Sequence, residues 1–186
     1  PEDNCKLYTD SSSGSTVYKP IGLLQRYGEN QQMYFGLLTG SYANNFSGGV
    51  LRSNIGNIQD EIDPDTGQFL TSVNGVIQNI NSLRLMGLQY ASTTTTFGPS
   101  GGGGTQGYDG CSWNNTPRSE GECPMWGNPI GEMMYETLRY FSGTASPTSE
   151  FTYSSSDSCY DNDLGLGLPS WEDRVNLIAY LETFGG

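Results

Sequence analysis

The chain has 186 residues, of which 34% are hydrophobic and 26 are glycine, a size and composition that suit one domain. Its formal net charge is −12, which argues against binding to nucleic acid or to an anionic membrane surface, because Lys and Arg hold both. The absence of histidine excludes a Ser-His-Asp triad, His-ligated zinc and haem with a proximal His. No apolar run reaches the ~18–20 residues that span a bilayer, so we expect no membrane span.

The first half of the chain alternates helical and extended patterns. Pro20 suits a first helical turn, so YKPIGLLQRYG predicts a short helix that ends at Gly28. The apolar run QQMYFGLLTG predicts a buried central strand, and GGVLRSNIG predicts the next strand. Apolar residues at three-and-four spacing in VNGVIQNINSLRLMG predict a second helix.

The second half begins with residues 91–110, a low-complexity stretch that predicts an exposed loop. A helix follows in WGNPIGEMMYETLRYF, and its apolar stripe is typical of a core-facing side: Ile130, Met133, Met134, Leu138 and Phe141. SWEDRVNLIAYLETF predicts a last helix with Ser170 as its N-cap. The alternation of strands and helices over residues 19–142 indicates an α/β fold.

We interpret residues 1–186 as a single module with three parts. Residues 18–90 form a strand and helix half, residues 91–127 an exposed loop that contains a disulfide, and residues 128–186 a helical half. The chain begins at PEDNCKLY without Met, which favours a mature or trimmed piece of a longer exported precursor.

The cysteines support an oxidising, extracellular compartment. There are four of them and no C-x-x-C pair, which favours disulfides over a metal cluster or a redox motif. Cys111 and Cys123 enclose a short polar loop and are the natural pair, and Cys5 with Cys159 would then tie the ends of the chain together. Other connectivities stay open.

Several stretches between about residues 18 and 171 carry a resemblance when they are taken in order: YKPIGLLQRYG, FGLLTGSYANNFSGGVLRSNIG, DEIDPDTGQF, NGVIQNINSLRLMG, MWGNPIGEMMYETLRYFSG and SPTSEFTY. They resemble the PilY-type proteins, which are large adhesins and assembly factors at the tip of bacterial type IV pili. The resemblance implies an α/β fold, an incomplete von Willebrand A-like sheet-and-helix module with long Gly/Ser/Thr-rich loops. It also implies an extracellular or cell-surface, pilus-associated location. The implied partners are pilus or filament subunits, the remainder of a PilY-type chain, and a host or surface receptor.

The resemblance raises one metal hypothesis. In the von Willebrand A pattern a loop residue before this helix gives an oxygen to a divalent cation, and Asn128 stands at that place. The alternative is that Asn128 caps the helix and Pro129 occupies its first position. The Asp-x-Ser-x-Ser ligand motif is not matched, since YTDSSSGS carries Asp10, Ser12 and Gly14 instead and no strand is expected before it. We therefore do not expect a complete adhesion-type metal site.

Two acidic clusters are further candidates for calcium, the only cofactor that the sequence suggests. DSCYDNDLGLG brings Asp157, Asp161 and Asp163 together, and the alternative is a solvated acidic loop. In DEIDPDTGQF, Asp63 and Asp65 resemble the start of a calcium loop but lack its closing Glu, so we favour a Pro-Asp-Thr-Gly turn.

Two functions follow as hypotheses. The first is a non-enzymatic extracellular adhesin or filament-associated protein related to the type IV pilus tip. The alternative is a secreted carboxylate-dependent hydrolase that uses Glu132 and Glu136, two side chains that we expect to be solvated. The module lacks the family's first and later strands, so we expect partner contact by strand addition or through the last helix, at Val175, Leu177, Ile178 and Leu181.

Overall fold

A computed structural model of the chain describes residues 2–84, 117, 119–121, 127–154 and 160–171. The protein is mixed α/β, and short 3₁₀ turns at Gln59–Glu61 and Ser149–Phe151 join its longer elements. These elements are β1 (Cys5–Thr9), β2 (Thr16–Pro20), α1 (Leu23–Gly28), β3 (Phe35–Thr39), β4 (Val50–Gly56), α2 (Val76–Ser82), α3 (Ile130–Phe141) and α4 (Tyr160–Asp163). No helix in this part of the chain combines the length and apolar character needed to cross a membrane.

The described strands form two separate antiparallel pairs, β1 with β2 and β3 with β4. Leu38 lies opposite Leu51, and the β3–β4 register shifts near Leu37. The predicted α/β class is confirmed at this coarse level. The von Willebrand A-like arrangement stays a prediction, since the strands that are described pair only antiparallel.

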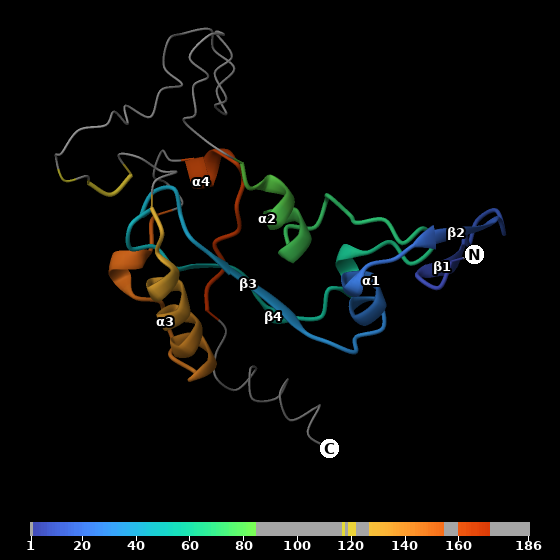
Figure 1. Ribbon diagram of the computed structural model, residues 1–186, viewed down its shortest axis with the longest axis horizontal. Helices are drawn as coiled ribbons and strands as arrows, with labels where there is room; N and C mark the ends of the chain where they lie inside the picture. The colour runs from blue at the N-terminus through green and yellow to red at the C-terminus, as the bar shows by residue number, and fades with distance from the viewer. Residues whose placement is uncertain (1, 85–116, 118, 122–126, 155–159, 172–186) are drawn as a thin grey trace, which may run out of the picture.

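The β3–β4 sheet separates two apolar clusters, with α3 on one side and α2 on the other (Figure 1). Successive side chains of a strand point to opposite faces, so Leu38 joins the cluster on the α3 side and Leu37 the cluster on the α2 side. The α3 cluster contains Leu51, Tyr140 and Trp171, and the α2 cluster contains Ile58, Ile62, Val76 and Ile77. A small apolar cluster therefore packs on each face of this short sheet, and a third cluster forms around Tyr42 and Leu166.

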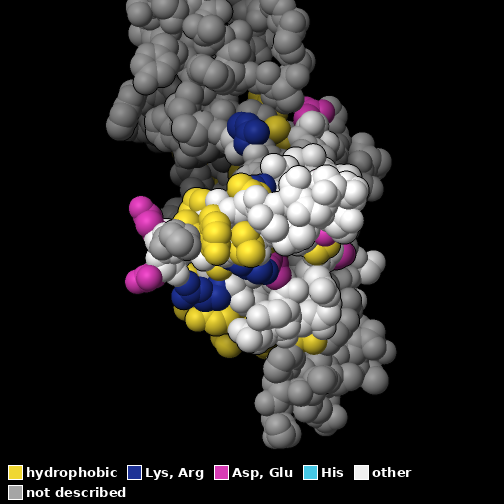
Figure 2. All heavy atoms as spheres, turned by 90° about the vertical axis from the view of Figure 1, so that its right-hand side faces the viewer, with side chains coloured by type: hydrophobic (Ala, Val, Ile, Leu, Met, Phe, Trp, Pro, Cys, Tyr) yellow, Lys and Arg dark blue, Asp and Glu magenta, His cyan; other side chains and the backbone are white. Residues whose placement is uncertain are grey.

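The β1–β2 hairpin lies at one end of the molecule, far from α3 (Figure 1). Tyr8 anchors it, because the ring is 2% exposed and its hydroxyl donates to the Glu29 carboxylate. Burial, together with that hydrogen bond, raises the pKa of Tyr8 above its ordinary value. Figure 2 views this end, where hydrophobic side chains gather beside basic ones, and Leu7 and Tyr18 are exposed.

Two predictions for the first half of the chain are wrong in detail. Pro20 does not open a helix, because it pairs with Cys5 as the last residue of β2, and α1 begins at Leu23 after the N-cap Gly22. β3 is a strand as predicted, but it is half-buried in a two-stranded sheet rather than central. The strand β4 and the helix α2 are confirmed.

The helix α3 is confirmed, but no described residue buries most of its predicted core stripe. Ile130, Met134, Leu138 and Phe141 are 56%, 65%, 69% and 51% exposed, and only Met133 of the stripe is half-buried. The fully buried positions are Glu136 and Tyr140. The helix turns this polar side inward because the buried groups find partners there, with the Tyr140 hydroxyl donating to Asn54 and accepting from the Ile55 amide.

Candidate functional site

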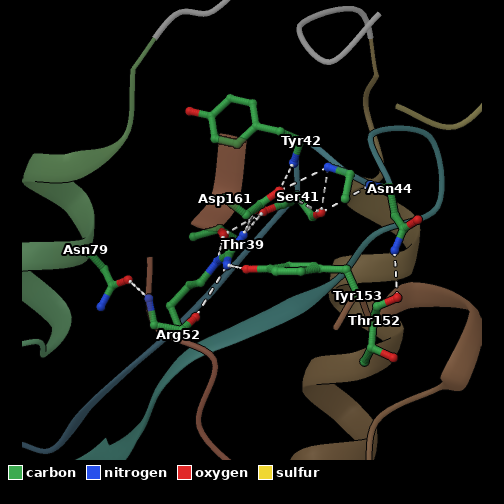
Figure 3. A network of polar contacts seen from close by, with 12 residues as sticks. Thr39, Ser41, Tyr42, Asn44, Arg52, Asn79, Thr152, Tyr153 and Asp161 are labelled. Carbon is green, nitrogen blue, oxygen red and sulfur yellow. Dashed lines mark hydrogen bonds and ion pairs between the residues drawn. The ribbon is translucent and has the colours of Figure 1, made fainter. Parts of the chain in front are cut away.

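A buried arginine on β4 organises the centre of the described structure (Figure 3). Arg52 is 1% exposed, and a guanidinium group carries five N–H donors that must find acceptors when it is buried. The acceptors are Thr39 Oγ1 at 2.9 Å from Nε, the carbonyls of Gly40 at 3.1 Å and Gly167 at 3.3 Å, the Tyr153 hydroxyl and Asp161 Oδ1. Every donor of Arg52 is therefore used.

Asp161, on α4, balances the charge of Arg52. Both side chains are fully buried, so their pairing avoids the high cost of an isolated charge in the interior. The second carboxylate oxygen, Oδ2, accepts hydrogen bonds from the amides of Tyr42 at 2.8 Å and Ala43 at 3.0 Å and from the Ser41 hydroxyl at 3.3 Å. The pair thus joins β4 and α4 to the turn that follows β3.

That turn belongs to the loop of residues 40–49, which connects β3 to β4 and is held by distant parts of the chain. Asn44 Nδ2 donates to the Thr152 carbonyl at 2.9 Å (Figure 3), and Asn45 Oδ1 accepts from the Gly121 amide at 2.8 Å. Within the loop, the Ser41 hydroxyl accepts from the Ala43 and Asn44 amides at 3.1 Å each. The loop is therefore fixed by contacts that lie ~75 to 120 residues away in sequence.

The same network reaches α2. The Gly167 amide donates to Asn79 Oδ1 at 2.6 Å, and Asn79 is 1% exposed (Figure 3). A Cβ at Gly167 would lie 2.3 Å from the Arg52 carbonyl oxygen, so only glycine lets the two backbones approach. The Tyr42 hydroxyl, whose pKa is raised by burial, donates to the Arg84 carbonyl at 2.6 Å.

A pocket of about 230 Å³ lies beside the network. Its described walls are mainly small or polar residues of the loop and of the chain before α3: Thr39, Gly40, Ser41, Tyr42, Asn45, Leu83, Gly127 and Pro129. The charged atoms of Arg52 and Asp161 are saturated by each other and by protein groups. The Arg52–Asp161 network can therefore support the wall of the pocket, but neither of these two charged groups is available to bind a ligand.

The predicted metal residues are only partly described, and the calcium hypothesis stays a prediction. Asn128 is exposed, and the N-cap of α3 is Pro129, without a side-chain cap, so the capping alternative for Asn128 is wrong. Asp161 is engaged by Arg52, Asp163 is exposed, and Asp157 lies outside the described residues. Among residues with a described position, no group of three or more acidic or Cys side chains could hold a metal.

The turn interpretation of DEIDPDTGQF is confirmed. Asp63 Oδ1 accepts from the amides of Asp65 at 2.9 Å and Thr66 at 3.0 Å, and Gly67 adopts a φ of 65°. Asp65 in turn accepts from the Ser11 amide at 3.0 Å, in the hairpin loop. Asp63 thus closes its own turn, and Asp65 links that turn to the loop between β1 and β2.

The two helix carboxylates do not form a solvated pair. Glu136 is 0% exposed, which contradicts the expectation of a solvated side chain. Its oxygens accept from the Thr148 amide at 2.9 Å and hydroxyl at 2.5 Å, and Arg139 Nε lies 3.1 Å away. Glu132 is half-buried on the preceding turn. Glu136 fastens the chain after α3 to the helix.

The remaining predicted residues mostly lie outside the described structure. These are Cys111, Cys123 and Cys159, the predicted partner contacts Val175, Leu177, Ile178 and Leu181, and nearly all of the loop at 91–127. Cys5 is half-buried and forms no disulfide with a described residue. Because Cys111, Cys123 and Cys159 are not described, both bridges stay predictions.

Sequence reasoning missed the central residue of the network. The sequence pattern predicts only a strand around Arg52, although it holds one signal: a basic residue directly after Val50 and Leu51, in a chain with 8 Lys and Arg in all. A charge in an apolar strand needs a buried counter-charge. Its partner, Asp161, is 109 positions away, so the sequence did not identify it.

Comparison with known proteins identifies the family. The chain matches the family described as PilY1 homolog, second domain, over residues 35–181. The chain belongs to the PilY1 family. It is 45% identical over 180 residues to the type IV pilus biogenesis factor PilY1 homolog of Xylella fastidiosa (strain Temecula1), a match that covers 92% of this chain and 11% of that relative. No solved structure matches the chain.

The PilY1 match agrees with the resemblance found in the sequence and includes the whole network around Arg52 and Asp161. The β1–β2 hairpin lies before the matched range. The chain spans only about a tenth of its PilY1 relative, 11% of its length.

Proposed function

We propose that this chain is a structural module of a type IV pilus biogenesis factor, which acts through contacts with other polypeptides and not through catalysis. The supporting observation is its 45% identity to a PilY1 homolog that bears that name. The function is carried by the surface around the 40–49 loop, because the Arg52 and Asp161 network binds the backbone at the start of that loop.

The burial and the hydrogen bonds of two acidic side chains support the non-catalytic part of this proposal. Glu136 and Asp161 are fully buried, and hydrogen bonds or ion pairs occupy both oxygens of each carboxylate. A general acid or base needs access to its substrate. Glu136, one half of the proposed hydrolase pair, has its carboxylate directed to Thr148 and Arg139 instead.

The finer parts of the proposal follow from the family. We place the module outside the cytoplasm at the pilus, as an adhesin or filament-associated part with a von Willebrand A-like relationship. Its partners would be pilus subunits, the rest of a PilY1-type chain, and a host or surface receptor. Calcium is kept only as a hypothesis for Asn128, Asp157 and Asp163, since Asp161 is already occupied by Arg52.

The proposal is tested in the source bacterium with the full-length gene. Arg52→Met should disrupt the module and reduce the number of surface pili, measured by shearing the cells and blotting the pilin. Arg26→Met is the matched control, since Arg26 is exposed at the end of α1, and it should leave piliation unchanged. The full-length protein is quantified in both strains.

The outcomes distinguish a role in pilus biogenesis from a role in adhesion. Loss of pili with Arg52→Met supports a part in biogenesis. Normal piliation with lost adherence supports the adhesin form of the proposal. Normal piliation and normal adherence in a strain whose module is unfolded would contradict both.

A further inference from the structure

The exposed side of α3 carries large apolar side chains that no described residue covers. Ile130, Met134, Leu138 and Phe141 are each more than half exposed, and Tyr135 is 51% exposed. Positions that differ by three, four or seven lie on one side of a helix, so the first four residues form a continuous band, which we call the α3 stripe. Surfaces of this kind mark a contact site.

The α3 stripe borders an apolar cleft of about 290 Å³ between α3 and the β3–β4 sheet. Phe141 belongs to both the stripe and the cleft. The other described lining residues are Tyr34, Gly36, Leu37, Leu38, Leu51, Ile55, Thr137 and Tyr140. Stripe and cleft thus form one apolar surface that runs from the helix onto the sheet.

The described chain ends at the edge of this surface. The Trp171 indole packs edge-on against Tyr140, with 5.4 Å between ring centroids, and both rings share a cluster with Leu51. The Ser170 carbonyl accepts from Asn54 Nδ2 at 2.9 Å, which fixes the backbone beside β4. Residues 172–186 therefore start next to the cleft, and they are long enough to reach along α3 at ~1.5 Å per residue in a helix.

The sequence of that segment suits the surface. Its pattern predicts an amphipathic helix with Leu177, Ile178 and Leu181 on one side. The family match continues to residue 181, so most of this segment belongs to the same matched domain as α3 and the sheet. A cover supplied by the chain itself needs no second molecule and pays no association entropy.

We propose that the α3 stripe and the adjoining cleft are covered by the chain's own last segment, residues 172–184. The apolar side of the segment packs on Met134, Leu138 and Phe141. Leu177 and Leu181 then complete the core of the domain instead of contacting another protein. A second copy of the chain and another domain of the full protein are the competing occupants.

Methionine oxidation tests this cover in the wild-type 186-residue chain. Hydrogen peroxide converts accessible methionine to the sulfoxide, which peptide mass spectrometry detects. Without a cover Met134, 65% exposed, should react at least as fast as Met33, 47% exposed. With the cover, Met134 should react about tenfold more slowly than Met33, which corresponds to docking favoured by about 1.4 kcal/mol.

Variants test whether residues 172–184 cause the slow oxidation of Met134. Replacing both Leu177 and Leu181 with Ala should raise the Met134 rate and leave the Met33 rate unchanged. Glu182→Ala, on the polar side of the segment, is the matched control and should change neither rate. Sedimentation at the working concentration shows whether the chain is monomeric.

A second variant keeps the test decisive if the leucine variant unfolds. Leu138→Asp should cost little on an open surface but should lower Tm by at least about 3 °C under an apolar cover. The proposal is overturned if wild-type Met134 reacts as fast as Met33, if its protection requires dimerisation, or if protection survives the loss of both leucines. An unchanged Tm for Leu138→Asp would also overturn it.

Discussion

At the residue scale, an ion pair and hydrogen bonds offset the cost of burying the Arg52 charge. Its ion pair with Asp161 is fully enclosed, and each remaining N–H has a protein acceptor. Removing one partner leaves the other charge buried and unpaired, which costs far more than the pair contributes when it is intact. The network should therefore be sensitive to single substitutions at either end.

Arg52→Met should destabilise the protein by about 3–5 kcal/mol, because Asp161 then stays buried without a counter-charge. Urea denaturation of the purified chain, followed by circular dichroism, measures the loss. Arg26→Met removes an equal charge from an exposed position and should cost less than about 1 kcal/mol. Similar losses for both variants would contradict the central role of Arg52.

Asp10 provides a pH-dependent prediction at the same scale. Hydrogen bonds from the Ser12 hydroxyl, then from the Ser12 and Ser13 amides, lower the pKa of Asp10 from 3.8 to about 2. A depressed carboxyl pKa stabilises the fold above the ordinary value and loses that contribution as the pH falls through the folded value. The turn at residues 10–15 should thus be kept at pH 4 and loosened near pH 2.

Carboxyl-carbon NMR titration checks the Asp10 pKa directly. Ser12→Ala is the control, since it removes the hydroxyl donor and should raise the Asp10 pKa toward 3.8. A wild-type Asp10 that titrates near its ordinary value would show that these hydrogen bonds do not persist in solution.

At the element scale, the entry to α3 depends on close backbone packing. Gly127 lies against the 40–49 loop, and a Cβ there would be 1.6 Å from the Asn45 carbonyl oxygen. Gly131, four positions later in the helix, has nothing within 4 Å of such a Cβ. Two nearby glycines therefore serve different purposes, although the sequence does not distinguish them.

Gly127→Ala should destabilise the protein by about 1–3 kcal/mol, because a backbone atom blocks the new methyl group. Gly131→Ala should stabilise it by up to about 1 kcal/mol, since alanine favours the helix and meets no obstacle. Thermal unfolding of both variants against wild type measures the contrast. A gain in Tm for Gly127→Ala would contradict the close contact with Asn45.

At the scale of the whole molecule, two small apolar clusters on either side of a short sheet and a third around Tyr42 and Leu166 hold the described part together. Such limited cores are often supplemented by covalent links in exported proteins. The predicted Cys111–Cys123 bridge would be such a link. It lies outside the described residues and stays a prediction.

Non-reducing peptide mapping of the full chain should find Cys111 joined to Cys123. In the chain-entropy model, a loop of this size contributes about 3 kcal/mol, so reduction should lower the urea midpoint. Replacing both cysteines with serine should give the same midpoint with and without reductant, apart from any effect of Cys5 and Cys159. Free thiols at both positions in the non-reduced protein would refute the bridge.

Local pattern was enough to predict several elements. The strands β3 and β4, the helices α2 and α3 and the turn at Asp63 depend on neighbouring residues, whose periodicity and turn chemistry the sequence shows directly. The same local logic misplaced the start of α1. Pro20 is compatible with both a helix start and a strand end, and its pairing with Cys5 decided between them.

The sequence by itself determined the family, the mixed α/β class and the absence of histidine chemistry, because these follow from composition and from the order of short stretches. Only the tertiary structure decided which side of α3 meets the sheet and which charges meet. Amphipathic spacing placed Met134 and Leu138 inward, yet Glu136 is buried, because Thr148 supplies donors that no local pattern reveals. Arg52 and Asp161 likewise meet only when the chain brings β4 to α4, since a buried charge selects its partner in space and not in sequence.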